Sequence, residues 1–193
     1  KVNHSIICQA GCYNSFLGKL DISVRNGEII KFNGRLIPIK LSIPEDKVVR
    51  ALLNRYYNKL KDTMEKVIGK TNFFLDGHSA RYHPTRFSRL ITAAMKEFGK
   101  TDLSIINAGA IRGDINKGLI TVSDIYRVLP FQDEIIILKL KGNYLKKIIE
   151  RACSFKKGSG ARLLFDGIQI RNGKIFINNK PLVKQKEYTC LLY

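Results

Sequence analysis

The feature that most constrains this chain is a short apolar run that leads directly into a turn of small residues. Residues 103–106 (Leu-Ser-Ile-Ile) are typical of a buried strand, and residues 107–112 follow as Asn-Ala-Gly-Ala-Ile-Arg. Such a turn lets a ligand approach the backbone closely, and Gly109 can adopt a positive φ. Asn107 offers an amide and Arg112 a planar set of donors, which suit oxygen-rich ligands. The stretch predicts a ligand site at a strand end.

An aromatic residue follows this turn at a distance that allows it to join the same site. Residues 123–128 form a short helical patch, and a proline-stiffened loop then presents Phe131. An aromatic face beside a basic side chain favours a nucleotide or a similar flat, anionic ligand. Two alternatives stay open. Phe131 can be an ordinary core residue, and Arg112 can form a structural ion pair with Asp114 or Asp133.

These motifs, taken in order, resemble the C-terminal domain of the 5'-nucleotidase family. There the pattern N-[GA]-G-[GA]-I-R precedes G-x-I-T, L-P-F, an apolar strand and G-x-x-L-K-x-x-x-E. The chain has the corresponding segments in the same order at residues 107–112, 118–121, 129–131, 135–140 and 142–150, and the likeness continues through 160–167 and 188–193. The family comprises two-domain metallophosphatases that hydrolyse nucleotides and related phosphate esters, so the resemblance implies this activity for the full-length protein.

The resemblance also implies roles for individual residues. Phe131 matches the first of two aromatics that sandwich the base, and Asn107 matches a residue that contacts the base edge. Arg81 and Arg112 match arginines that contact the substrate. Without the family context, Arg81 is a solvated surface charge, which remains the alternative interpretation.

Two glycines complete the predicted substrate site. Gly109 belongs to the small-residue turn. Gly160 ends the loop 156–160, whose glycines can expose backbone N–H groups to a ligand, although a plain mobile loop is the alternative.

The segment that leads into the second helix departs from the family pattern. The family has R-x-x-[EQ]-[ST]-N-[LM]-G-N-L-I, whereas Pro84, Arg86 and Ser88 here replace the acidic or amide, Asn and Gly positions. The local polar network must therefore differ from that of the family.

Three segments are predicted along the chain. Residues 1–41 contain short strands with a hairpin turn at Asn26 and Gly27, and they resemble the last strands of the family's metallophosphatase domain. Residues 42–68 form a linker helix, opened by a capping box from Ser42 to Glu45. Residues 69–193 form the substrate-binding domain. The predicted fold class is α+β, with a mixed sheet and flanking helices.

Several local elements are predicted inside these segments. The linker helix runs to Val67, with Gly69 after its last turn, and residues 72–76 form a strand or strand-like entry. The next helix closes at Gly99 and is expected to turn one apolar face inward, formed by Phe87, Leu90, Ile91, Ala94, Met95 and Phe98.

The chain offers little for metal-dependent chemistry. Its three histidines, His4, His78 and His83, form no paired ligand motif. In the resembled family, two divalent metal ions and the catalytic histidine lie in the N-terminal domain, upstream of Lys1. We therefore predict no catalytic and no metal-binding residue here, and we interpret the chain as a piece of a longer protein that also ends before the second aromatic.

A formal net charge of +18 supports an alternative function, a non-catalytic basic module for nucleotides or polyanions. No helix-turn-helix, zinc-finger or RNP signature accompanies the charge, so a specific nucleic-acid partner is not predicted. No segment is apolar enough for a membrane span. Family analogy places the protein in the periplasm or outside the cell, and the oligomeric state stays open.

The four cysteines are too few and too dispersed for a disulfide scaffold. We interpret them as small buried thiols. An exported protein can pair Cys8 with Cys12, and this possibility stays open.

Overall fold

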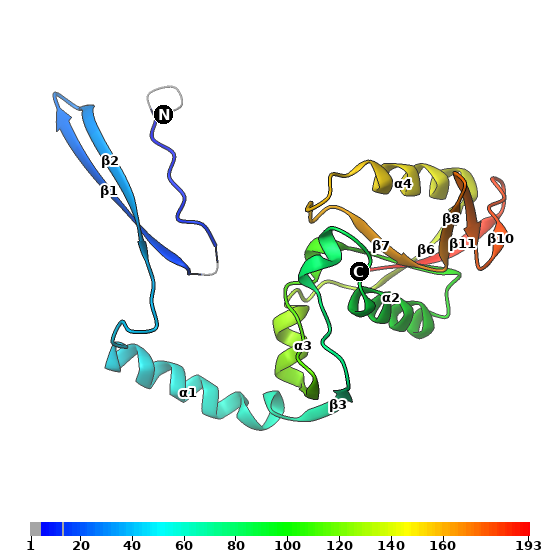
Figure 1. Cartoon of the computed structure of the whole chain (residues 1–193), viewed down its shortest axis with the longest axis horizontal. Helices are drawn as coiled ribbons and strands as arrows, with labels where there is room; N and C mark the ends of the chain where they lie inside the picture. The colour runs from blue at the N-terminus through cyan, green and yellow to red at the C-terminus, as the bar shows by residue number, and fades with distance from the viewer. Residues whose placement is uncertain (1–4, 13) are drawn as a thin grey trace. The chain divides into compact units, whose positions relative to one another are not determined.

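The computed structural model describes residues 5–12 and 14–193. Its internal contacts divide the chain into two compact units, Lys1–Lys59 and Leu60–Tyr193. The helix α1, Lys47–Met64, runs across the division (Figure 1). The first unit is a hairpin with the start of this helix, and the second holds the central sheet.

The hairpin of the first unit pairs β1 (Phe16–Arg25) with β2 (Glu28–Pro38) in antiparallel register. The turn works as expected, because Asn26 and Gly27 both have positive φ values, 50° and 81°. The expectation of short strands here was wrong, because residues 16–38 form two long strands and Gly34 pairs with Leu20 inside a single β2.

Helix α1 begins later than its predicted capping box. The carboxylate of Asp46 accepts hydrogen bonds from the backbone N–H groups of Val48 and Val49, at 2.8 and 3.0 Å, so Asp46 is the cap and the box at Ser42 was wrong. The helix also ends earlier, at Met64. The next residues form the strand β3.

Strand β3 (Val67–Thr71) pairs with β5 (Gly118–Thr121) in an antiparallel two-stranded sheet. Residues 72–76, predicted as a strand or strand-like entry, contribute only an isolated bridge between Leu75 and Ile115. The partner of β3 lies about fifty residues further along the chain, and no local pattern in residues 67–71 reveals it.

The central sheet of the second unit is mixed, as predicted. Strand β11 runs parallel to β4, whereas β6 and β7 are antiparallel to their neighbours. The order across the sheet is β6 (Ile136–Lys141), β11 (Glu187–Leu192), β4 (Leu103–Asn107) and β7 (Leu163–Asp166). With its helices, this sheet confirms the α+β class.

Helices α2 (Arg86–Gly99) and α4 (Gly142–Ser154) cover opposite faces of this sheet (Figure 1). Successive side chains of a strand point to opposite faces. Leu103 and Ile105 of β4 accordingly join a core cluster with α4, whereas Ile106 joins a second cluster with α2. Each face of the sheet therefore has its own core.

A smaller antiparallel sheet packs on the α4 side. Its order is β10 (Lys180–Pro181), β9 (Lys174–Ile177) and β8 (Ile168–Arg171), and the two-residue β10 was not predicted. Ile168 and Ile177 of this sheet pack in the same core cluster as the buried side chains of α4.

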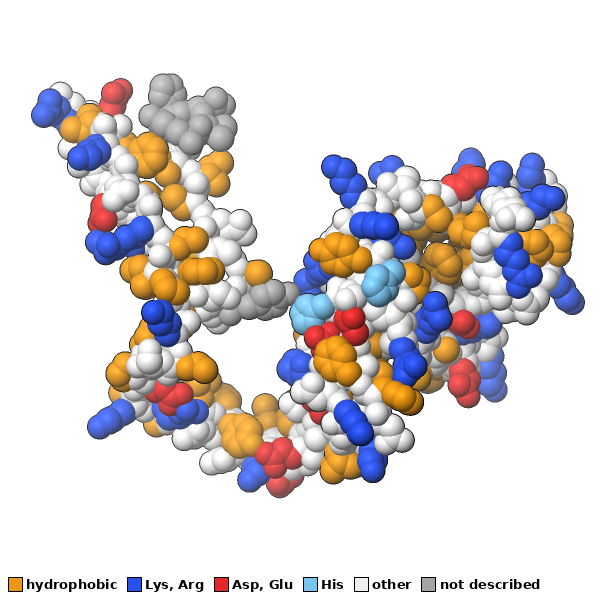
Figure 2. Space-filling model, in the orientation of Figure 1, with side chains coloured by type: hydrophobic (Ala, Val, Ile, Leu, Met, Phe, Trp, Pro, Cys, Tyr) orange, Lys and Arg blue, Asp and Glu red, His pale blue; other side chains and the backbone are white. Residues whose placement is uncertain are grey.

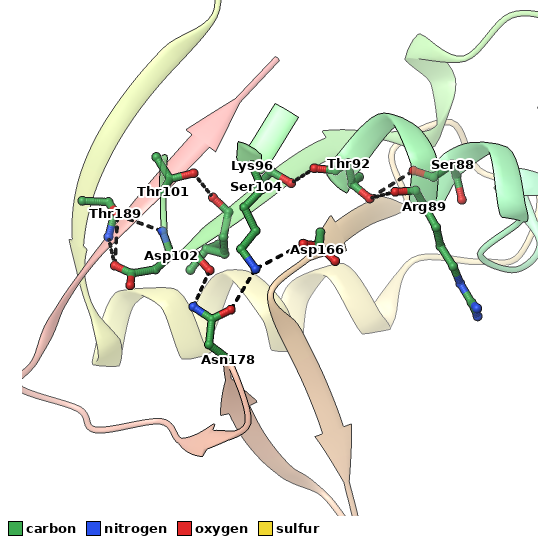
Figure 3. A network of polar contacts seen from close by, with 11 residues as sticks. Ser88, Arg89, Thr92, Lys96, Thr101, Asp102, Ser104, Asp166, Asn178 and Thr189 are labelled. Carbon is green, nitrogen blue, oxygen red and sulfur yellow. Dashed lines mark hydrogen bonds and ion pairs between the residues drawn. The ribbon is translucent and has the colours of Figure 1, made fainter. Parts of the chain in front are cut away.

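The inward face of α2 differs from the predicted one. Leu90, Ala94 and Phe98 are exposed, whereas Ser88 and Thr92 are buried. These buried hydroxyls are satisfied, because Thr92 donates to the Ser88 carbonyl at 3.0 Å (Figure 3). In turn, Ser104 of β4 donates to the Thr92 carbonyl at 2.6 Å. The bond between Ser104 and Thr92 therefore helps to decide which face of α2 turns toward the sheet, together with its apolar side chains.

A network of polar side chains joins the central sheet to α2 around Asp102, at the start of β4 (Figure 3). The Asp102 carboxylate accepts hydrogen bonds from the backbone N–H and hydroxyl of Thr189, at 2.8 and 2.9 Å, which joins the start of β4 to β11. Lys96 of α2 donates to the Asn178 side chain at 2.8 Å and pairs with Asp166 at 3.3 Å. The network links α2 to three strand ends.

The cysteines are free, and only Cys190 matches the expectation of a buried thiol. Cys8, Cys12 and Cys153 are exposed. Burial raises the pKa of Cys190 to about 12, so this thiol is unreactive at neutral pH.

Candidate functional site

The second unit contains an open hollow of ≈ 450 Å³ at the end of β4. Its lining residues are Arg81, Asn107, Gly109, Ala110, Arg112, Phe131, Asp133 and Gly160. We call it the Arg112 hollow. All six residues that the sequence predicts for substrate binding line it, although they come from segments up to eighty residues apart.

Two glycines in back-to-back contact shape one wall of the Arg112 hollow. Gly109, in the 3-10 helix η2 (Ala108–Ala110), donates its backbone N–H to the Gly160 carbonyl at 2.8 Å. A Cβ on Gly109 would lie 3.0 Å from that carbonyl oxygen, tighter than most real contacts. The positive φ that the sequence allowed does not occur at Gly109. Glycine is needed here for close backbone approach.

Asn107 is the last residue of β4 and closes the same wall. Its side-chain Nδ2 donates to the Gly160 carbonyl at 3.2 Å, which orients the amide. The amide oxygen has no hydrogen-bond partner within the part of the chain that the structure describes. It can therefore accept a hydrogen bond from a ligand.

Arg112 lies over Phe131, with its Cζ atom 5.0 Å from the ring centroid. This distance permits a cation–π contact. The Arg112 backbone is held where α3 (Val122–Val128) ends, because its N–H donates to the Val128 carbonyl at 2.8 Å. Phe131 is 39% exposed and belongs to neither core cluster. Both side chains are thus available to a ligand.

The structural ion pair considered for Arg112 is not found among the described residues, with either Asp114 or Asp133. Asp114 instead accepts the backbone N–H groups of Gly77 and His78, at 2.7 and 3.1 Å, and pairs with the His78 ring at 2.9 Å. Burial alone would raise the pKa of Asp114, but these hydrogen bonds and the His78 charge outweigh burial and lower it.

Arg81 ends the 3-10 helix η1 (His78–Arg81) and is tied to the glycine-rich loop. Its carbonyl accepts the backbone N–H of Gly158 at 2.9 Å, and its Cζ lies 3.9 Å from the position of a Cβ built on Gly160. The loop 156–160 is therefore hydrogen-bonded to the segment that carries Arg81.

The residues that depart from the family pattern have structural partners next to this arginine. Ser88 forms a reciprocal capping box with Thr85, with bonds of 2.9 and 3.1 Å. Arg86 lies over the Phe73 ring, with Cζ 4.2 Å from its centroid. These substitutions begin α2 without removing Arg81 from the hollow.

Sequence reasoning did not assign Ala110 and Asp133 to the site. Asp133 lies two residues after Phe131, a proximity that could have indicated it. Tyr193 supports the same loop, because its hydroxyl donates to the Phe131 carbonyl. Burial raises the pKa of Tyr193, and the Asp133 charge raises it further. A contact across 62 residues leaves no local sequence signal.

No group of three or more His, Cys, Asp or Glu side chains suited to a metal ion occurs among residues 5–12 and 14–193. Within the same described ranges, no helix has the length and apolar character needed to cross a membrane. Two arginines, an amide, an aromatic ring and a carboxylate therefore line the hollow together.

Comparison with known proteins identifies the domain. Residues 67–193 match the family model of the 5'-nucleotidase C-terminal domain. Snake venom 5'-nucleotidase of Macrovipera lebetinus is 31% identical over 182 residues, which cover 85% of this chain and 45% of that protein. Protein UshA of Yersinia enterocolitica is 28% identical over 211 residues, 96% of this chain and 38% of that protein.

A solved structure supports the fold. The 5'-nucleotidase precursor from Thermus thermophilus superposes with a TM-score of 0.77 over 96% of this chain and 41% of that chain, at 24% sequence identity. The chain spans less than half the length of each of these three relatives.

Proposed function

The chain belongs to the family of 5'-nucleotidase C-terminal domains, and we propose that the Arg112 hollow binds a nucleoside or nucleotide. The chain would then be the substrate-recognition part of a phosphatase that hydrolyses nucleoside phosphates to nucleoside and phosphate. One observation carries the proposal: two arginines, an amide and an exposed aromatic ring line a single hollow.

Each residue has a role that its chemistry supports. Phe131 stacks on the base, and the free amide oxygen of Asn107 accepts a hydrogen bond from the base edge. Arg81 and Arg112 compensate the phosphate charge, because guanidinium groups bind phosphate through paired hydrogen bonds. Arg112 already covers Phe131 in this structure, so nucleotide binding moves the guanidinium or uses the opposite face of the ring.

Phosphate-ester hydrolysis commonly uses metal ions to polarise the ester and activate water. The described residues do not fit two divalent cations, and we derive no step through them. We propose that a separate catalytic domain of the full-length protein holds both metals, and that this chain alone is inactive. Periplasmic or extracellular location is likewise a proposal, made by analogy with the family.

Calorimetric titration of the chain with adenosine and AMP tests the site. Base–aromatic stacking contributes about 1–3 kcal/mol, so Phe131→Ala should weaken binding by about 5- to 150-fold. The matched control is Phe73→Ala, because Phe73 is also exposed beneath an arginine but lies outside the hollow. Equal binding by the wild type and Phe131→Ala would contradict the proposed site.

Phosphatase assays with AMP and Mn²⁺ test the division of labour. A longer protein that includes a metallophosphatase domain should release phosphate, and residues 1–193 alone should not. Activity of the short chain would show that we have misplaced the metal site.

The second candidate function is a basic module for polyanions. Its support is the charge of +18, and Figure 2 shows lysine and arginine side chains spread over the visible face of each unit. Steeply salt-dependent binding to DNA or heparin that nucleosides do not compete would favour it. Competition by AMP would favour the nucleotide site.

A further inference from the structure

A second candidate site lies along β7, which is the outermost strand of the central sheet. Its pairing with β4 decides which backbone groups point outward. Ala108 donates to the Arg162 carbonyl at 2.7 Å, and the register pairs Ile106 with Leu164. Hydrogen-bonded and non-hydrogen-bonded pairs alternate in antiparallel sheets. Leu164 therefore bonds to β4, whereas Leu163 and Phe165 turn their N–H and C=O groups to the open edge.

These outward groups are unpaired within the described part of the chain, because no other strand or loop there forms a hydrogen bond with the backbone of Leu163 or Phe165. Such an edge is a template for another strand. The first half of α2 and the last turn of α4 flank this edge of β7 and limit access to it. They enclose a cavity of ≈ 190 Å³, which we call the β7 cavity.

Two arginines, Arg89 and Arg162, line the β7 cavity. Neither forms an ion pair with an acidic side chain among residues 5–12 and 14–193. Its other walls are largely apolar and include both Leu163 and Phe165. The cavity shares no residue with the Arg112 hollow. It therefore offers backbone donors, backbone acceptors and two guanidinium groups that the nucleotide site does not use.

We propose that the β7 cavity docks an extended acidic peptide segment of a partner protein as an added strand. The peptide backbone would pair with Leu163 and Phe165, and its carboxylates would bind Arg89 and Arg162. A small anion would use only the donors and leave the two carbonyl groups unpaired. A second copy of this chain does not fit, because two chains of charge +18 repel each other.

The test uses the full 193-residue chain and a capped hexapeptide in which valine and glutamate alternate. In the free chain, amide hydrogens of Leu163 and Phe165 should exchange rapidly, and that of Leu164 slowly. The peptide should slow exchange at Leu163 and Phe165 and leave Leu164 unchanged, as followed by NMR. Cys153 lines the cavity and should be alkylated more slowly in the complex, with Cys8 and Cys12 as internal controls.

Variants and altered peptides separate charge from strand pairing. Each of Arg89→Gln and Arg162→Gln should weaken binding about tenfold, the usual effect of losing a charged hydrogen bond. Arg55→Gln on α1 is the control and should not. N-methylation of alternate peptide amides should abolish binding, and lysine in place of glutamate should do the same. Unchanged exchange at Leu164 verifies that each variant is folded.

Three outcomes would overturn the proposal. Undiminished binding of the N-methylated peptide would leave only an anion site. Equal binding of the lysine peptide would remove the role of the arginines. Slow exchange at Leu163 and Phe165 in the free chain would mean that the edge is already covered.

Discussion

The two units differ in how they treat their apolar side chains. Every buried hydrophobic residue lies at or beyond Leu75, and none of the described residues of the first unit is buried. Yet β1 has the alternating pattern of a strand that is covered on one face, with Leu20, Ile22 and Val24 at every second position, although its register with β2 shifts between Ser23 and Val24. The comparison shows that an apolar pattern in the sequence is enough to form a strand. The apolar side chains of that strand become buried only where a helix or another sheet packs over them.

Physical principles explain why the second unit should dominate stability. An isolated two-stranded hairpin is marginal in water, and most helical stability comes from packing of an apolar face. The central sheet has a helix on each face and a separate core beneath each helix. We therefore expect matched substitutions to have unequal effects in the two units.

The largest expected effect comes from the core. Leu103→Ala removes a fully buried side chain and should lower the free energy of unfolding by about 2–5 kcal/mol. Leu20→Ala in the hairpin, where the side chain is 40% exposed, should change it by less than about 0.5 kcal/mol. Urea unfolding followed by circular dichroism measures both, and similar losses would end the comparison.

A glycine pair gives the second effect. Gly109→Ala places a methyl group 3.0 Å from the Gly160 carbonyl oxygen, and such crowding should cost about 1–3 kcal/mol and weaken adenosine binding. Gly34→Ala in β2 meets only an ordinary contact at 3.8 Å. Melting temperatures of both variants test this prediction. An unchanged melting temperature for Gly109→Ala would show that the backbone around Gly160 can move to accommodate the methyl group.

Helix caps give a smaller contrast. Thr121 accepts the Asp124 N–H at 3.3 Å at the start of α3, and Thr121→Ala should cost about 0.5–2 kcal/mol. Asp46→Ala removes the cap of α1 and should shorten that helix without moving the main unfolding transition. Circular dichroism monitors the helix content, and near-ultraviolet tyrosine signals monitor the core.

The smallest effect is a pH dependence that arises from two carboxylates of the second unit. The Thr121 backbone N–H, with the Thr121 hydroxyl and Arg127, lowers the pKa of Asp124 against the opposing effect of burial, and the pKa of Asp114 is also lowered. A folded-state pKa below the unfolded value, about 3.9, stabilises the fold above that value. This stabilisation is lost as the pH falls through the folded-state pKa. Asp124→Asn should therefore flatten the dependence of the melting temperature on pH between about pH 5 and 3.

Sequence reasoning succeeded where one short segment carries the whole signal. The run 103–106 predicted the buried strand, and the loop after α3 predicted an available Phe131. It failed where a residue far away in the sequence determines the local structure. Examples are the pairing of β3 with β5 and the burial of Ser88 and Thr92 in α2. The predicted boundary near residue 69 and the substrate roles of the six residues stay predictions.

The sequence by itself determined the family, the α+β class and most of the helices and strands, and it predicted six residues that line one hollow. Only the tertiary structure decided that Gly160 meets Gly109, that Asp133 joins the hollow and that Tyr193 supports Phe131. It also leaves the outer edge of β7 without a neighbouring strand among the described residues, beside two arginines. The reason is that the conformational preferences of neighbouring residues set the backbone conformation of a short segment. Contacts between distant residues form only when the packing of the whole domain offsets the entropy lost in closing long loops.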